Sequence, residues 1–120
     1  MTYQEMWSRQ RRAYTSVEVY INAELKAADE ARLEIVAEDI RRYLNCCWGV
    51  ERINVDTDDV EYNEEADTEH KGGIVDGVFR VYFIAYNCDI DFTPFDIIDN
   101  VENTIQALNP VRIATEYYKD

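Results

Sequence analysis

The segment Val78–Tyr86 constrains the fold of this chain more than any other. It reads Val-Phe-Arg-Val-Tyr-Phe-Ile-Ala-Tyr, so β-branched and aromatic residues occupy both alternating sets of positions. Such residues favour strands, and a strand that is apolar on both faces is typical of the middle of a sheet. The sequence therefore predicts a central strand over Ile74–Asn87.

Three shorter segments alternate apolar and polar residues with the period of a strand. Two lie at 53–55 and 60–62, and the third is the segment 111–115 near the end of the sequence. Residues 63–73 are rich in charge and end in Gly-Gly, which predicts a loop or the tip of a long hairpin.

Helical spacing dominates the first part of the chain. Aromatic residues among polar ones predict a short amphipathic helix over 2–14, and Thr15-Ser-Val-Glu18 has the form of a capping box. An apolar stripe at helical spacing follows that box: Val17, Tyr20, Ile21 and Leu25. Asp29 marks a second helix start, and apolar residues then recur every three or four positions over 33–47. We expect the helix to end near Gly49, and the pattern leaves open whether 15–47 is one helix or two.

A last helix is predicted by the segment Thr93-Pro-Phe-Asp96. A hydroxyl N-cap, a proline at the first helical position and an acid in the first turn are all typical of helix starts. An apolar stripe then runs to Asn109-Pro110, so the helix is expected at about 94–109. Taken together, the chain is predicted to be one α+β domain over 1–120. It combines N-terminal helices, a three- to four-stranded antiparallel or mixed sheet, the Pro-started helix and a final strand.

Length and composition argue against several classes of protein. No run of about 18 apolar residues predicts a membrane helix, and the first residues lack the apolar stretch of a secretory signal. Cys46, Cys47 and Cys88 are odd in number, and two are adjacent, which suits neither a disulfide framework nor a zinc site. We expect reduced, mostly buried thiols in a cytoplasmic protein.

Negative charge is concentrated in the second part of the sequence. Residues 1–45 carry seven Lys or Arg and eight Asp or Glu, whereas residues 46–120 carry five and seventeen. The densest stretch, 51–69, contains nine acids and a single basic residue, Arg52. Self-repulsion of this kind opposes compactness, whereas its field attracts basic surfaces and repels nucleic acid. The sequence therefore predicts an acidic protein-binding surface and argues against direct nucleic-acid binding.

Catalytic signatures are weak by comparison. His70 is the only histidine, and Glu69-His70-Lys71 places the Glu-x-Lys form of a nuclease metal site in a loop rather than on a strand. Asp56–Glu61 resembles a calcium loop but lacks the glycine and the closing glutamate of an EF-hand. The pair Asp89 and Asp91 is expected on the polar face of a sheet edge. We expect no enzymatic activity, no cofactor and no metal, although the acidic hairpin leaves an irregular divalent site open.

Several other residues fit a role in recognition or assembly. The chain has nine tyrosines, a residue type that interface hot spots favour. Arg41 and Arg42 are expected to pair with acids on their own helix or with the acidic face of a neighbouring subunit. The residues expected to bind a partner are the acids Asp56, Asp58, Asp59, Glu61, Glu64, Glu65, Asp67, Glu69, Asp89 and Asp91.

In overall character the chain resembles the phage-encoded anti-CRISPR and anti-restriction proteins that mimic DNA. It is short, α+β, strongly acidic and without paired cysteines. The acids of 51–69 carry the resemblance, together with Asp89, Asp91, Asp96, Asp99 and Glu102. The resemblance implies a non-catalytic inhibitor in the cytoplasm of a host cell. Such an inhibitor occupies the basic nucleic-acid-binding surface of a host defence nuclease or other DNA-binding protein.

The alternative is a phage structural subunit, such as a connector or tail-completion ring protein. The segment 77–109, a long strand followed by Asp-x-Asp and a Pro-started helix, is similar in shape to that group. In this interpretation the 63–73 hairpin reaches a neighbouring copy, and near-neutral and acidic parts dock head to tail in a homo-oligomer.

Overall fold

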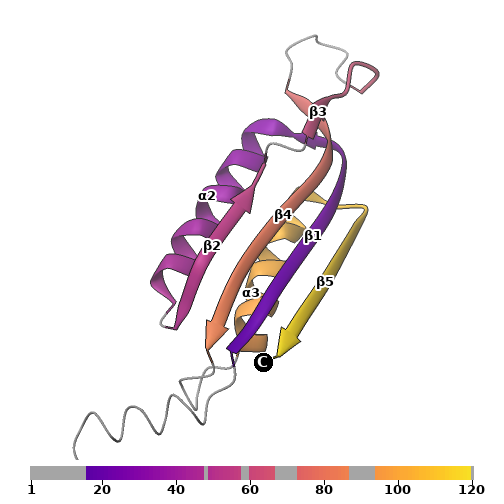
Figure 1. The fold of residues 1–120 in the computed structure, drawn as a ribbon. Helices are drawn as coiled ribbons and strands as arrows, with labels where there is room; N and C mark the ends of the chain where they lie inside the picture. The colour runs from indigo at the N-terminus through magenta and orange to yellow at the C-terminus, as the bar shows by residue number, and fades with distance from the viewer. Residues whose placement is uncertain (1–15, 48, 58–59, 67–72, 87–93, 120) are drawn as a thin grey trace, which may run out of the picture.

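The computed structural model describes residues 16–47, 49–57, 60–66, 73–86 and 94–119, and Figure 1 shows how their helices and strands are arranged. In chain order these are β1 (Ser16–Asp29), α2 (Glu30–Cys46), β2 (Val50–Asp56), β3 (Val60–Tyr62), β4 (Ile74–Tyr86), α3 (Pro94–Ile105), the short 3-10 helix η1 (Gln106–Leu108) and β5 (Arg112–Lys119). The predicted α+β class is confirmed, as are the Pro-started helix and the final strand.

The sheet is antiparallel and has the order β2-β4-β1-β5, with the short β3 also paired to β4. Without β3, the order of elements is β-α-β-β-α-β with β4 inserted between β1 and β2. This is the ferredoxin-like, split β-α-β topology. The segment predicted as the central strand does lie in the middle of the sheet, since β4 pairs with β1 on one side and with β2 and β3 on the other.

The prediction of a helix after the Thr15-Ser-Val-Glu18 capping box is wrong, because Ser16–Asp29 is a strand of 14 residues. Its buried residues alternate strictly: Val17, Val19, Ile21, Ala23 and Leu25. A helix would have buried only part of this set, whereas a strand held between β4 and β5 buries all of it on one face. Tertiary pairing therefore overrode a local helix signal. The short helix expected over 2–14 lies outside the described residues.

The second helix start is confirmed, because Asp29 is the N-cap of α2. Its Oδ1 accepts hydrogen bonds from the backbone N–H groups of Ala31 and Arg32 at 3.0 and 3.4 Å. The helix ends at Cys46, shortly before Gly49, which has a φ of 82°. The expectation of buried thiols is wrong for Cys46, which is exposed, and Cys47 is half-buried. Cys88 lies outside the described residues.

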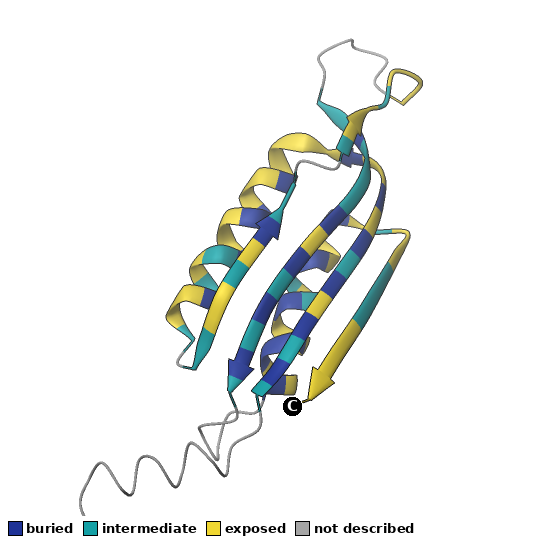
Figure 2. Ribbon diagram, viewed as in Figure 1, coloured by how far each residue is buried: buried dark blue, intermediate teal, exposed yellow. Residues whose placement is uncertain are grey.

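Both helices cover the same face of the sheet (Figure 1). Figure 2 shows buried positions alternating with less buried ones along β1 and β4, and the buried residues of the helices and strands form one core. From β4, Phe79, Phe83 and Ala85 are fully buried in it. The stripe of α3 meets them with Ile97, Ile98, Val101 and Ile105. The last helix is shorter than the expected 94–109: α3 stops at Ile105, η1 follows, and Asn109 turns the chain with a φ of 50°.

Each of two strands contains one extra residue relative to β4. In β1 the register shifts between Leu25 and Ala28, and in β2 it shifts between Glu51 and Asn54. A residue of left-handed conformation lies in each bulge, Ala27 and Arg52, both with a φ of 55°. Such bulges bend a strand and increase its twist. In β1 the bulge is fastened by Asp76, whose Oδ1 accepts a hydrogen bond of 2.7 Å from the N–H of Ala27.

Candidate protein-binding surface

One face of the sheet carries no helix among the described residues, and we call it the open face (Figure 1). Residues directly opposite each other on paired strands share a face, so the pairing register gives its members. They are Ser16, Glu18, Tyr20, Asn22 and Glu24 of β1; Glu51, Asn54 and Asp56 of β2; Val78, Arg80, Tyr82, Ile84 and Tyr86 of β4; and Arg112, Ala114, Glu116 and Tyr118 of β5. Tyrosine and carboxylate side chains therefore dominate this face.

Glu18, two residues from the start of β1, organises the open face near one end. One carboxylate oxygen, Oε1, accepts hydrogen bonds from the hydroxyls of Tyr20 at 2.6 Å and Tyr82 at 2.9 Å. The two rings are in contact, with centroids 4.9 Å apart. A third ring, that of Tyr118, meets Tyr20 edge-on at 5.9 Å. Three aromatic rings from three neighbouring strands thus form one cluster around a carboxylate.

The carboxylates raise the pKa of the phenols that bond to them. The hydrogen bond to Glu18 is the main cause that raises the pKa of Tyr20 from 10.0 to about 12, and it also raises that of Tyr82. The hydrogen bond from the Tyr118 hydroxyl to Glu116, 3.0 Å long, raises the pKa of Tyr118. These phenols therefore remain neutral hydrogen-bond donors to a higher pH than a free tyrosine.

A shallow hollow of about 370 Å³ lies beside this cluster. Its lining comes from β1, β2 and β4: Tyr20, Asn22, Asn54, Asp56, Arg80, Val81 and Tyr82. At one end of the face the Tyr86 hydroxyl donates to Glu51 at 2.7 Å. By strand pairing, the open face carries five carboxylates, those of Glu18, Glu24, Glu51, Asp56 and Glu116, and the guanidinium groups of Arg80 and Arg112. The guanidinium of Arg52, in the β2 bulge, is also close enough to act on Tyr82 of this face.

The hairpin that contains β3 extends one end of the sheet, as Figure 1 shows. Asn63 anchors it, because its amide donates to both carboxylate oxygens of Asp76 at 3.0 Å and its Oδ1 accepts from the N–H of Ala66 at 3.0 Å. The hydrogen bonds from Ala27 and Asn63, in that order of importance, lower the pKa of Asp76. The side chains of Glu61, Glu64 and Glu65 are exposed on this hairpin.

Of the ten acids expected to bind a partner, the structure describes four. Glu61, Glu64 and Glu65 are exposed at the hairpin, and Asp56 is half-buried at the end of β2, opposite Arg80. The others lie outside the described residues: Asp58, Asp59, Asp67, Glu69, Asp89 and Asp91. The sequence prediction includes Asp56 of the open face but not Glu18, Glu24 or Glu116. Glu18 and Glu24 are missed because the predicted helix occupies the segment that forms β1.

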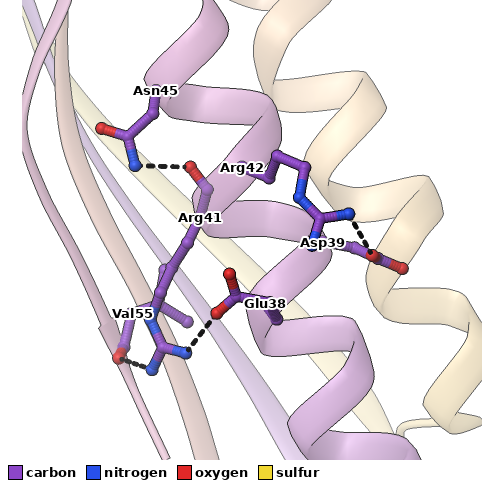
Figure 3. Close-up of polar contacts among 6 residues, drawn as sticks. All are labelled: Glu38, Asp39, Arg41, Arg42, Asn45 and Val55. Carbon is purple, nitrogen blue, oxygen red and sulfur yellow. Dashed lines mark hydrogen bonds and ion pairs between the residues drawn. The ribbon is translucent and has the colours of Figure 1, made fainter.

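The arginines of α2 are engaged within the domain, as Figure 3 shows. Arg41 contacts Glu38 at 3.6 Å and donates from Nη2 to the carbonyl of Val55 at 3.1 Å. Arg42 contacts Asp39 at 4.0 Å. The expectation that these arginines pair with acids on their own helix is confirmed. By contrast, α3 carries Asp96, Asp99 and Glu102 and no basic residue.

Two further findings limit the chemistry of the described part of the chain. Within it, His, Cys, Asp and Glu nowhere gather in a group of three that could hold a metal ion. None of its helices has the length and apolarity needed to cross a membrane. His70 and Lys71 lie outside the described residues.

Comparisons with known proteins give no family. No family model and no curated protein matches the sequence. Among solved structures, the chain is similar to LarC2, the C-terminal domain of a cyclometallase involved in the synthesis of the NPN cofactor of lactate racemase, with a TM-score of 0.47 and 10% identity over 88% of this chain. It spans 57% of that domain.

The chain is also similar to two other solved structures, a designed protein and an enzyme. The de novo designed protein Foldit4 has a TM-score of 0.45 and 14% identity, over 89% of this chain and 96% of that one. A hydantoinase/carbamoylase family amidase from Burkholderia ambifaria has a TM-score of 0.46 and 7% identity, over 89% of this chain and 28% of that one.

Proposed function

We propose that this protein is a non-catalytic inhibitor that binds the basic, nucleic-acid-binding surface of another protein. The observation that carries the proposal is the exposed, mainly negative charge of the β3 hairpin. Glu61, Glu64 and Glu65 are exposed there, and the stretch 53–70 contains no Lys or Arg, with Lys71 following it in the sequence. A segment in which acids so outnumber basic residues keeps a strong negative field outside the protein, and that field steers a basic surface toward it.

The open face supports the same proposal by offering a second set of acceptors. Its carboxylates lie beside aromatic rings, so an incoming arginine meets both a negative charge and the face of a tyrosine. Arginine favours both kinds of contact. Because Tyr20 and Tyr82 already donate to Glu18, that carboxylate is held in place before a partner arrives, which reduces the ordering cost of binding.

The proposal includes the nature of the target. A surface that binds Lys and Arg in the arrangement meant for phosphates competes directly with DNA or RNA. The composition resembles that of phage-encoded anti-CRISPR and anti-restriction proteins, so the proposed target is a host defence nuclease in the cytoplasm. No cofactor, metal or reaction is part of this function.

Competition with DNA tests the proposal. The binding of labelled duplex DNA to an RNA-guided nuclease and to a restriction endonuclease would be followed by fluorescence anisotropy while the protein is added. We expect displacement of DNA from at least one of them, and a weaker effect as salt rises, since exposed charges are screened over about 8 Å at physiological ionic strength. Unchanged DNA binding by both enzymes would contradict the proposal.

A charge-matched pair of variants locates the surface. The first changes Asp56 to Asn and Glu61, Glu64 and Glu65 to Gln, and it should lose displacement without a change in melting temperature. The control neutralises four acids of α2 to the same extent, Glu30, Glu34, Glu38 and Asp39, and should still displace DNA. Equal effects of the two variants would mean that total charge, rather than the hairpin, is responsible.

A further inference from the structure

The outer edge of β5 is the least protected edge of the sheet. Among the described residues, β5 pairs with β1 alone, so its other side presents backbone N–H and C=O groups to which no described strand is paired. An edge of this kind is a template for another strand, and proteins usually blunt it with bulges, prolines, charges or a covering element.

The opposite edge, at β2, has such protection. Its bulge at Arg52 breaks the register, α2 packs against it, and Arg41 of α2 donates a hydrogen bond to the carbonyl of Val55 (Figure 3). In contrast, β5 runs from Arg112 to Lys119 in one unbroken register and contains neither a proline nor a bulge. Its charged residues, Arg112, Glu116 and Lys119, are of both signs, so they do not exclude pairing with a second copy.

Exposed apolar and aromatic side chains also collect along β5. Tyr117 and Tyr118 are 48 and 53% exposed, and Val111, just before the strand, is 62% exposed. Phe95 of α3 is 40% exposed and touches the ring of Tyr117 edge-on at a centroid distance of 5.2 Å. A bare strand edge flanked by exposed apolar side chains is what an intermolecular sheet requires.

We propose that β5 pairs antiparallel with β5 of a second copy, about a two-fold axis at Thr115, so that two sheets become one. An antiparallel pair about such an axis must be centred on a residue, because centring between residues would bring opposite faces of the two sheets together. The choice of central residue is then decided by side chains.

Centring on Thr115 aligns Arg112–Tyr118 of one copy with the same residues of the other. Thr115 then faces Thr115, and Ile113 faces Tyr117 of the second copy, which are favourable cross-strand pairs. Arg112 lies diagonal to Glu116 of the second copy, and the symmetry produces this charge pair twice. Centring on Glu116 would instead place two glutamates face to face, and centring on Ala114 would shorten the pairing to Arg112–Glu116.

The charge of the protein gives this dimer a characteristic salt dependence. Each copy carries a net charge of −13, so the two copies repel each other at long range. Raising the salt concentration screens this repulsion. The dimer should therefore tighten with salt, whereas the complex with a basic partner under the proposed function should weaken.

Sedimentation equilibrium of the full chain is the first test. Over a range of concentrations we expect a monomer–dimer equilibrium whose Kd falls severalfold between about 0.05 and 0.5 M NaCl. A chain that stays monomeric at every concentration and salt level overturns the proposal, as does an assembly larger than a dimer.

Cysteine cross-linking then tests the register. In a background with Cys46, Cys47 and Cys88 changed to Ser, Thr115→Cys should form an intermolecular disulfide on mild oxidation, because the axis brings the two positions within disulfide range. Ala114→Cys and Glu116→Cys are the matched controls and should cross-link much less. Preferential cross-linking at either control position would overturn the register at Thr115.

A charge swap tests the proposed β5–β5 pairing without cysteine substitutions. Glu116→Arg should weaken the dimer about tenfold, because it replaces the charge pair with two guanidinium groups that repel each other, the new one and that of Arg112 in the second copy. The double variant Arg112→Glu with Glu116→Arg restores opposite charges and should recover the dimer. Circular dichroism shows that each variant is folded. If the single and double variants dimerise equally well, the proposed pairing of β5 is wrong.

Discussion

The two faces of the sheet are built from the same strands but differ in almost every property. In β1 the fully buried Val19 faces the helices and its neighbour Tyr20 faces outward, and in β4 the same is true of Phe83 and Tyr82. The covered face is aliphatic with phenylalanines, whereas the open face is a network of hydroxyls and carboxylates. One register therefore serves two purposes, because successive residues of a strand point to opposite sides.

The difference shows where stability and recognition reside. Burial of the covered face supplies the hydrophobic stabilisation of the domain. The open face gains little from burial, since its side chains are partly hydrated, and its hydrogen bonds arrange charge and aromatic surface for a partner. Substitutions at neighbouring residues of one strand can separate the two roles.

A charge placed on each face in turn tests the difference between the two faces most strongly. Ala85 is fully buried on the covered face, so Ala85→Lys should prevent folding, because an unpaired buried charge costs several kcal/mol. Ile84 lies between Glu18 and Glu51 on the open face, so Ile84→Lys should change stability by less than about 1 kcal/mol. Circular dichroism and urea titration of both variants provide the measurement, and a folded Ala85→Lys protein would contradict this assignment of faces.

Truncation of adjacent aromatic residues gives the next largest effect. Phe83→Ala should lower the free energy of unfolding by about 3–5 kcal/mol, because it leaves a cavity in the core, and Ile105→Ala by about 2–5 kcal/mol. Tyr82→Ala should cost clearly less than Phe83→Ala, since its ring is only half-buried. Urea unfolding of the three variants measures the order, and equal losses at Tyr82 and Phe83 would show that the open face is also part of the core.

The smallest effect concerns the phenols of the open face. Because the folded-state pKa of Tyr20, about 12, lies above its ordinary value of 10.0, the associated stability is complete below pH 10 and is lost as the pH rises toward 12. Phenolate absorbance, compared between the native protein and Tyr20→Phe, should show a phenol that titrates late. Glu18→Gln should move that titration toward pH 10, and a late titration that survives Glu18→Gln would remove Glu18 as its cause.

Most of the fold could be predicted because its strongest patterns are local. The central strand, the Asp29 cap, the Gly49 stop and the Pro94 start depend on neighbouring residues, and all of them are confirmed. The strand β1 was missed although the sequence contains its signal, strict alternation from Val17 to Leu25. The capping box competes with that signal, and only pairing with strands far along the chain decides between them.

The candidate surface could be predicted only in part for the same reason. The acids of the hairpin are adjacent in sequence, so Glu61, Glu64 and Glu65 were found from charge density alone. The cluster of Tyr20, Tyr82 and Glu18 joins residues more than 60 positions apart and exists only once β1 pairs with β4. A sequence pattern that treats 15–29 as a helix cannot bring these side chains together.

The two bulges also determine where this chain can change its length. At Ala27 and at Arg52 two residues already lie opposite one residue of β4, so loss of one of them would leave a regular ladder with every neighbour on its present side. A deletion elsewhere, for example at Asn22, would turn each residue between the cut and the bulge to the wrong side. Single-residue deletions in homologous chains should therefore occur mainly at these two positions. Elsewhere in the strands, the loss of one residue would disturb the alternation of buried and exposed side chains.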